Sequence, residues 1–390
     1  MAHSQQFSVA IIGGGVIGSA AAFFLSRAGV DRVCIIEPDP TYSKAATPLA
    51  TGGCRRLFSR PENIEMSKFS IDFFKRFAEQ VAVDGEAPEI GWKEWGYLFV
   101  VPPGHEQVLE RNYKVQTEHG VKVELLEHKA LKARYPWMHC DDLALGALSP
   151  EDGWLDPNGV LQGFRKKALA LGVTQLKDRV VDLFVSGHRV RSVELASGDR
   201  VEADYFINAA GTWAPSLAKL VGMNVPVNPM RRFEHYVEIE DVLPPMPLLK
   251  DPARLVSRPE GRGYSVGLVD GKEPRGFNLD VDPGYFERVV WPALAQRMPA
   301  FESLKVKREW AGLYDENELD GNMILGNWPG RLENFIVACG FSGHGLMHAP
   351  AVGRAIAELV EHGRYETIDL KRMGYQRVLD NKPYAEAGII

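Results

Sequence analysis

The sequence contains little cysteine, no long apolar segment and no large excess of charge of either sign. Its 390 residues include four cysteines without a C-x-x-C pair, which argues against a zinc site and against a disulfide framework. No apolar run is long enough to span a bilayer. The formal net charge of −6 gives no reason to expect nucleic acid or an anionic membrane as a partner. We therefore expect a cytoplasmic protein without a metal site, and the chain length predicts two domains.

The first 37 residues contain a nucleotide-binding pattern. Apolar runs at 7–12 and 32–36 predict two buried parallel strands, and a helix is predicted between them from about residue 16 to residue 28. The turn before this helix carries the G-x-G-x-x-G glycines and the first helical residues: Gly13, Gly15, Val16, Ile17 and Gly18. Phosphates bind at a helix N-terminus, where free N–H groups and the helix dipole favour anions. Glu37 ends the second strand and can accept hydrogen bonds from a ribose diol, but the pattern alone does not separate NAD from FAD.

Two further segments repeat the order of strand, glycine turn and helix. One covers residues 203–222, and the other covers residues 334–363. Three such units, at the start, middle and end of the chain, favour FAD, because the extended dinucleotide needs a second set of backbone donors at its flavin end. We therefore predict an α/β fold with a Rossmann-type FAD-binding domain and an interleaved substrate domain that contains a large mixed β-sheet. The predicted FAD-binding segments are 1–82, 151–223 and 323–390, and the predicted substrate-domain segments are 83–150 and 224–322.

The resemblance to a known family rests on several motifs. They are IIGGGVIG with Glu37, INAAGTWA and ACGFSGHGLMHAPAVGRAIAELV. These motifs resemble the D-amino-acid-oxidase superfamily, the glutathione-reductase-2 type of FAD oxidoreductase, which includes sarcosine oxidase, glycine oxidase and dimethylglycine dehydrogenase. The segments TGGCRRLFSRPENI and AGLYDENELDGN are most similar to the FAD-dependent oxidoreductase domain-containing proteins.

The resemblance implies oxidation of the C–N bond of an amine or amino acid of the N-alkyl or D-amino acid class. A hydride would pass to the flavin N5, the imine would hydrolyse, and oxygen or an electron carrier would accept the electrons. The alternative is an FAD-containing assembly or scaffold protein with little or no amine oxidation. By position, the resemblance implies further cofactor-binding residues: Gly52, Gly53, Arg55, Val180, Ala210, Gly211, Trp213, Gly312, Gly343, His344, Gly345, Leu346 and Met347.

The sequence departs from the family pattern at three places. Gly312 stands where sarcosine oxidase attaches its flavin to a cysteine, and no histidine lies near Gly52, so we expect non-covalent FAD. Ser265 stands in place of the lysine that activates oxygen, which favours a dehydrogenase over an oxidase. Met347 and Tyr314 replace the lysine and the arginine that bind substrate carboxylates, so another group must hold a carboxylate.

The candidate substrate residues follow from their chemistry. An arginine clamps a carboxylate with a planar, bidentate fork, and a tyrosine can place its hydroxyl over the flavin. The candidates for catalysis are Arg56, Arg232, Arg262, Tyr264, Tyr314 and His344. The ordinary interpretations remain open: surface positions for the arginines, packing for the tyrosines and a backbone-bonded structural role for His344. Neither the substrate nor the oligomeric state follows from the sequence.

Overall fold

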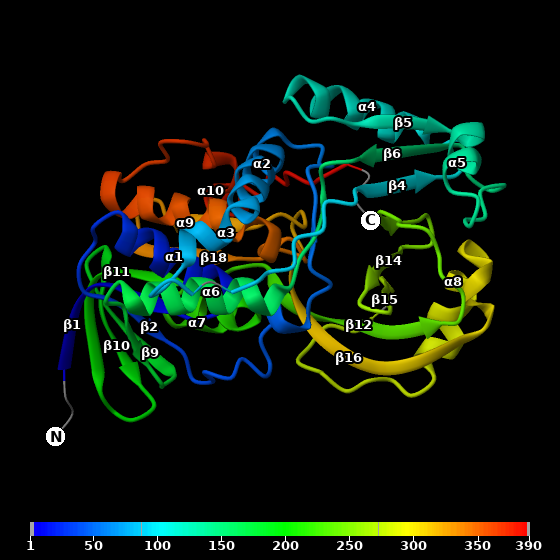
Figure 1. Ribbon diagram of the computed structural model, residues 1–390. Helices are drawn as coiled ribbons and strands as arrows, with labels where there is room; N and C mark the ends of the chain where they lie inside the picture. The colour runs from blue at the N-terminus through cyan, green and yellow to red at the C-terminus, as the bar shows by residue number, and fades with distance from the viewer. Residues whose placement is uncertain (1–3, 87, 272, 388–390) are drawn as a thin grey trace.

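The computed structural model describes residues 4–86, 88–271 and 273–387. Within them the chain forms two lobes, each built on an eight-stranded mixed sheet (Figure 1). The first lobe takes segments from the start, the middle and the end of the chain, and the second takes the segments between them. The fold is therefore the mixed α/β, two-domain arrangement that the sequence predicts.

The first sheet has the order β17-β18-β11-β1-β2-β8, and β10 and β9 continue from β11 by antiparallel pairing. Its strands are β1 (Ser4–Ile12), β2 (Val33–Ile36), β8 (Thr174–Leu176), β9 (Val180–Ser186), β10 (Arg189–Leu195), β11 (Arg200–Asn208), β17 (Ile324–Trp328) and β18 (Leu332–Cys339). β1 pairs in parallel with β2 and β11, and β11 pairs in parallel with β18. The carboxyl ends of these strands consequently open onto one edge of the sheet, where α/β proteins bind ligands.

Helices cover this sheet (Figure 1). They are α1 (Val16–Arg27), α2 (Pro61–Lys75), α3 (Phe77–Val81), α6 (Pro157–Ala170), α7 (Ala214–Leu220), α9 (Gly345–His362) and α10 (Gln376–Leu379), with the short helices η1 (Thr47–Leu49), η2 (Gly211–Trp213) and η5 (Lys371–Met373). α9 packs so closely on α1 that a Cβ on Gly353 would lie 2.7 Å from the backbone carbon of Ala20. The chain leaves helical geometry at Arg76 (φ −116°), so α2 and α3 are separate helices.

The second sheet has the order β16-β12-β15-β14-β13-β4-β6-β5. Its strands are β4 (Tyr97–Val101), β5 (Glu124–Glu127), β6 (Leu145–Ser149), β12 (Val227–Ile239), β13 (Leu248–Lys250), β14 (Leu255–Glu260), β15 (Gly263–Leu268) and β16 (Leu304–Asn317). The helical segments of this lobe are α4 (Glu106–Glu118), α5 (His128–Arg134), η3 (Phe286–Val290), α8 (Trp291–Arg297) and η4 (Pro299–Glu302).

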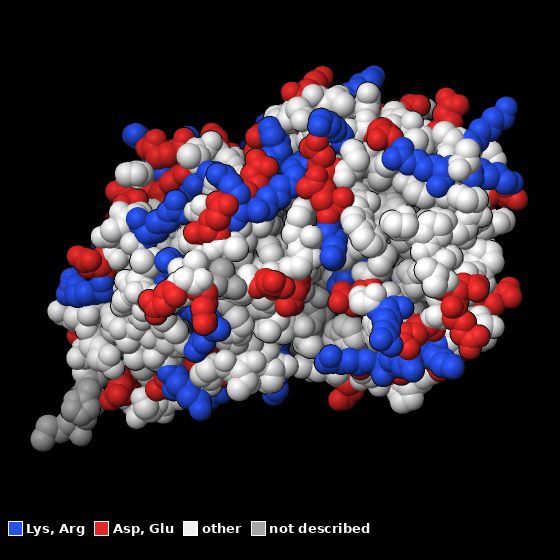
Figure 2. Space-filling view, viewed as in Figure 1, with Lys and Arg blue, Asp and Glu red and all other residues white. Residues whose placement is uncertain are grey.

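The two lobes are joined by a small ribbon and by long connections. β3 (Gly53–Cys54) pairs with β7 (Gly153–Trp154), so the loop after the first nucleotide unit is fixed against the chain that returns from the second lobe. On the face shown in Figure 2, lysine and arginine side chains are interspersed with aspartate and glutamate side chains over both lobes. No helix of the described part of the chain is both long and apolar enough to cross a membrane.

Candidate active site

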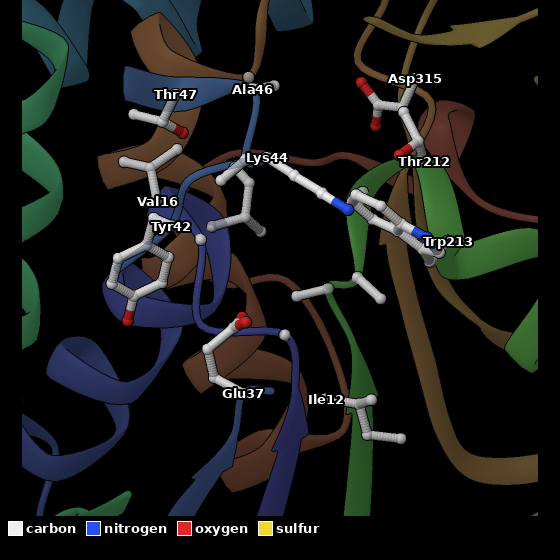
Figure 3. Close-up of a pocket in the computed structure, with 18 of the residues that line it drawn as sticks. Ile12, Val16, Glu37, Tyr42, Lys44, Ala46, Thr47, Thr212, Trp213 and Asp315 are labelled. Carbon is white, nitrogen blue, oxygen red and sulfur yellow. The ribbon is translucent and has the colours of Figure 1, made fainter. Parts of the chain in front are cut away.

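An elongated cavity of about 570 Å³ lies at the carboxyl ends of the first sheet and extends toward the second lobe. Glu37 and Val180 line one end of it, and Tyr314 and Gly343 line the other. Figure 3 shows Glu37 and Tyr42 on one side of the cavity and Thr212 and Trp213 on the other. All three strand–glycine–helix units of the sequence contribute to this one cavity.

The first glycine turn has the geometry that the motif requires. Gly13 has φ +99°, and a Cβ there would lie 2.6 Å from the carbonyl oxygen of Ala209 on the neighbouring turn. A Cβ on Gly18 would lie 1.9 Å from the carbonyl oxygen of Gly13, so only glycine fits under the turn. Gly15 differs, because a Cβ there would meet no described atom within 4 Å and would project into open space. The backbone at Gly15 is thus the part of the turn that a ligand can approach.

Glu37 closes the adenosine end of the cavity. Its carboxylate accepts hydrogen bonds from the backbone N–H groups of Gly14 and Asp39, both at 2.8 Å. Burial raises the pKa of this carboxyl, while the two N–H donors oppose that rise. The side chain is therefore fixed by the backbone, and its remaining lone pairs are available to a diol in the cavity.

The third glycine turn closes the opposite end. Asp315 of β16 accepts a hydrogen bond from the backbone N–H of Gly340 (2.7 Å), and this bond joins the turn to the second sheet. Gly343 has φ +94°, and a Cβ there would lie 2.4 Å from a ring carbon of Tyr314. α9 starts directly afterwards at Gly345 and has no side-chain cap among the described residues. Its first N–H groups are free to bind an anionic or electron-rich ligand edge in the cavity.

The residues around the cavity fit FAD. α1 also starts without a side-chain cap in the described chain, so uncapped helix N-termini stand at both ends of one elongated space. Twelve of the predicted cofactor residues line it: Gly13, Gly15, Val16, Ile17, Glu37, Val180, Ala210, Gly211, Trp213, Gly343, Gly345 and Leu346. The others lie outside its lining: Gly18, Gly52, Gly53, Arg55, Gly312, His344 and Met347.

Arg55 and His344 form a buried pair next to this cavity. Arg55 is 2% exposed, and its Nη2 donates a hydrogen bond to Nε2 of His344 at 3.1 Å. Because Nε2 accepts this bond, the ring carries its proton on Nδ1. Burial and the neighbouring Arg55 hold the pKa of His344 well below its ordinary value, so the ring is neutral. The Arg55 guanidinium also lies 4.0 Å from the ring centroid of Phe58.

Arg232 and Tyr314 form a second pair, on neighbouring strands of the second sheet. The Arg232 guanidinium lies 5.1 Å from the ring centroid of Tyr314, and its Nε is buried without a hydrogen-bond partner among the described residues. Burial raises the pKa of Tyr314, so its hydroxyl stays protonated and can donate a hydrogen bond.

The other candidates lie elsewhere. Arg56 is buried, but it forms an ion pair with the fully buried Asp152 at 3.3 Å. Arg262 lies in the exposed turn between β14 and β15. The Tyr264 ring packs edge-on against Phe301 at 4.8 Å in a core cluster. The structure therefore brings Arg232, Tyr314 and His344 together. The other three candidates, Arg56, Arg262 and Tyr264, lie apart from them.

Two charged residues of the second sheet are not predicted as site residues from the sequence. Glu234 of β12 is buried and accepts hydrogen bonds from the hydroxyls of Thr51 and Ser265. Lys250 ends β13 directly beside Phe99 of β4. Lysines and glutamates at strand positions normally indicate a solvated sheet face, and the sequence shows no other signal that this face is covered by a second lobe.

Comparison with known proteins agrees with this geometry. A family model described as DAO, FAD dependent oxidoreductase, matches residues 8–359. The chain belongs to the DAO family of FAD-dependent oxidoreductases. This DAO-family chain is 38% identical to FAD-dependent oxidoreductase domain-containing protein 1 of Xenopus laevis, over 99% of this chain and 85% of that protein. It is 25% identical to monomeric sarcosine oxidase of Bacillus sp. (strain B-0618), over 93% of this chain and 94% of that protein.

Solved structures show the same DAO fold. The structure of L-proline dehydrogenase from P. horikoshii superposes with a TM-score of 0.88 and 23% sequence identity, over 98% of this chain and 100% of that chain. FAD is the cofactor of this family, in agreement with the cavity. The protein is therefore an FAD-dependent oxidoreductase.

Proposed function

We propose that this oxidoreductase oxidises the C–N bond of an amine or amino acid, of the N-alkyl or D-amino acid class. The observation that carries the proposal is the position of Arg55. This arginine is buried beside the flavin end of the cavity, and it forms no ion pair with a carboxylate among the described residues. A buried guanidinium without an acidic partner is costly unless a ligand supplies the anion. An amino acid supplies a carboxylate and places its amine nearby.

The relatives support this class. Monomeric sarcosine oxidase and mitochondrial sarcosine dehydrogenase, which is 26% identical in Mus musculus over 92% of this chain, are both named for an N-methyl amino acid. The aligned part covers 40% of that sarcosine dehydrogenase.

The chain's own residues would orient the substrate and exclude water. FAD, when bound, supplies the two-electron acceptor for the hydrogen that leaves the carbon next to the nitrogen, and the imine product then hydrolyses. Tyr97 lies within hydrogen-bond reach of Arg55, and burial raises its pKa to about 12, so its hydroxyl stays a donor. His344 is neutral and accepts from Arg55, which fixes the guanidinium. Phe58 and Phe99 cover the guanidinium and keep water away from it.

We further propose a dehydrogenase rather than an oxidase. At the sheet position where the resemblance places an oxygen-activating lysine, Ser265 donates a hydrogen bond to Glu234. A carboxyl group at that position does not supply the positive charge that would stabilise developing negative charge on oxygen, and we assign the cations of this site, Arg55, Arg232 and Lys250, to the substrate instead. Mixing the reduced protein with aerated buffer in a stopped-flow instrument tests this proposal. We expect slow reoxidation in air and fast reoxidation by a quinone, and fast reoxidation in air would contradict it.

The substrate class is tested by anaerobic addition of N-methyl, N-carboxymethyl and D-amino acids to the FAD-loaded protein. We expect at least one of them to bleach the visible absorption of the flavin. Arg55→Met should weaken the response, while the matched surface change Arg111→Met on α4 should leave it unchanged. If no amine bleaches the flavin, the oxidation proposal is wrong, and the interpretation as an FAD-containing assembly protein is favoured.

A further inference from the structure

Three cationic side chains gather around the aromatic residues that lie next to the flavin end of the cavity. Arg55 comes from the loop after the first nucleotide unit, Lys250 from the end of β13, and Arg232 from β12. The backbone partner of Lys250 is Phe99 on β4, and the partner of Arg232 is Gly312 on β16. Tyr314, two residues after Gly312, is therefore on the same sheet face as Arg232, and it lines the cavity.

Shared rings connect the three cations. The guanidinium of Arg55 lies 5.2 Å from the ring centroid of Phe99, and Nζ of Lys250 lies 5.9 Å from the same centroid. The ring of Tyr97 stacks on Phe99 at 5.5 Å and is also within 5.9 Å of Arg55. Arg232 lies against Tyr314, which touches the turn that positions His344, the hydrogen-bond partner of Arg55. The charges of Arg55 and Arg232 both act on Lys250, so the three cations lie near one another instead of on separate surfaces.

None of the three cations forms an ion pair within the described residues. Arg55 donates to the carbonyl of Leu57 and to His344, and Arg232 donates to the carbonyl of Arg231 while its Nε has no partner. Nζ of Lys250 lies over the Phe99 ring, and no hydrogen bond or ion pair of this side chain occurs within the described part of the chain. Glu234, on the same face of β12 as Arg232, is already hydrogen-bonded to Thr51 and Ser265, and burial raises its pKa. Glu316 acts on Arg232, and Asp152 and Glu386 act on Arg55, but none of these acids forms an ion pair with either arginine among the described residues. The site therefore holds an excess of positive charge.

We propose that the substrate is a secondary amine with two carboxylates, an N-carboxyalkyl amino acid, and that Lys250 holds the second carboxylate. This inference rests on the proposed amine oxidation and names its substrate class. A single carboxylate would leave two of the three cations unpaired, whereas two carboxylates flanking an amine match the distribution of charge. Oxidation of such a compound removes two electrons and two protons from the C–N bond, with FAD as acceptor. Addition of water to the imine then releases an oxo acid and a primary amino acid.

The environment of Lys250 makes its charge sensitive to pH. Burial, and then the charges of Arg55, Arg232 and Arg254, lower the pKa of this lysine to about 7. The charged and titratable groups that interact with it are those three arginines and His344 at the start of α9. Tyr97 on β4 lies beside Arg55, and Glu234 shares the face of β12 that carries Arg232, on which Glu316 also acts. A bound carboxylate favours the protonated form of the Lys250 side chain. The affinity for the second carboxylate should therefore fall as the pH rises above about 7.

The test measures binding of two thioethers, which resemble the substrate but cannot be oxidised at nitrogen. Thiodiacetate carries two carboxylates and (methylthio)acetate carries one. Isothermal titration calorimetry with the FAD-loaded protein should give thiodiacetate an affinity at least tenfold higher. Lys250→Met should reduce this preference to about twofold or less, and Lys305→Met on the exposed part of β16 should preserve it. Lys250→Arg should keep most of the preference and remove its decline above pH 7.

Several outcomes overturn the inference. Equal affinity of the wild-type protein for the two thioethers does so, and so does an unchanged preference in Lys250→Met that still carries FAD and unfolds at the wild-type temperature. If Lys250→Met does not fold, the pH dependence of the wild type against Lys250→Arg decides. Flavin bleaching separates the two proposals. Reduction by sarcosine but not by iminodiacetate refutes the dicarboxylate substrate and leaves amine oxidation intact, whereas no reduction by any amine refutes amine oxidation itself.

Discussion

The glycines of the first motif allow a prediction that separates folding from cofactor binding. Gly18 packs against Gly13 inside the turn, whereas Gly15 faces the cavity. In Gly18→Ala the new Cβ would lie 1.9 Å from the carbonyl oxygen of Gly13. Ordinary contact begins near about 3.4 Å, so the turn or α1 must move by more than about 1 Å, and overpacking of this kind costs about 1–3 kcal/mol. In Gly15→Ala the Cβ meets nothing within 4 Å, and Gly15 already has a φ of −57°. The free energy of unfolding of the apoprotein should therefore change by less than about 0.5 kcal/mol.

For binding of the cofactor we expect Gly15→Ala to be the more damaging of the two variants. The Cβ of Gly15→Ala occupies the space through which a pyrophosphate reaches the backbone, so FAD affinity should fall at least tenfold, which is about 1.4 kcal/mol. Thermal unfolding of the apoproteins by circular dichroism measures the first effect, and quenching of flavin fluorescence on titration measures the second. Because the stabilisation by a ligand grows with the logarithm of its affinity, Gly15→Ala should also gain less stability from added FAD. Wild-type FAD affinity in Gly15→Ala, or an apoprotein as unstable as Gly18→Ala, would refute the assignment of the two glycines.

Two buried polar groups and the lining of the cavity allow three further predictions. The pKa of the buried His348 is lowered to about 3, whereas an unfolded histidine has a pKa near about 6.5, so below pH 6.5 the unfolded chain binds more protons than the folded one. The free energy of unfolding should therefore fall by about 1.4 kcal/mol for each pH unit below that point. In urea unfolding, His348→Gln, which can still form a hydrogen bond with Ser67, should show a weaker dependence on acid pH. Arg377 pairs with the fully buried Asp320 at 2.7 Å, so Arg377→Met should destabilise by about 3–5 kcal/mol in urea unfolding, and the added change Asp320→Asn should recover part of that loss. Among the described residues that line the cavity there is no cysteine or histidine, so acid precipitation should release all of the flavin into the supernatant, and yellow colour retained in the pellet would contradict non-covalent binding.

The sequence predicts the nucleotide half of this protein well because its signals are local. Each unit combines an apolar strand, glycines with a defined spacing and a helix, and the positive φ of Gly13 and Gly343 is required by the turn itself. These features need only neighbouring residues to be recognised. The three units could therefore be assigned to one cofactor before their arrangement in space was known.

The substrate side could not be predicted in the same way. Arg55 and Arg56 are adjacent in the sequence, yet Arg56 pairs with Asp152 while Arg55 contacts His344. Successive residues of an extended chain point in opposite directions, and no pattern in the sequence tells which of the two faces a ligand. Lys250 lies near Arg55 only because β13 pairs with β4, a contact between segments about 150 residues apart. Such convergence is a property of the topology rather than of any motif.

The discontinuous first sheet also determines when the protein can acquire its cofactor. β11 pairs with β1 on one side and with β18 on the other, and α9 packs on α1. A ribosome that has made the first 320 residues has therefore produced neither β18 nor α9, and α1 still exposes the apolar surface that α9 will cover. Nascent chains of this protein must therefore remain open until α9 has been made, and we expect flavin loading to follow that point. Premature termination anywhere before α9 yields a product that cannot hold FAD and that exposes an apolar helix to chaperones and proteases.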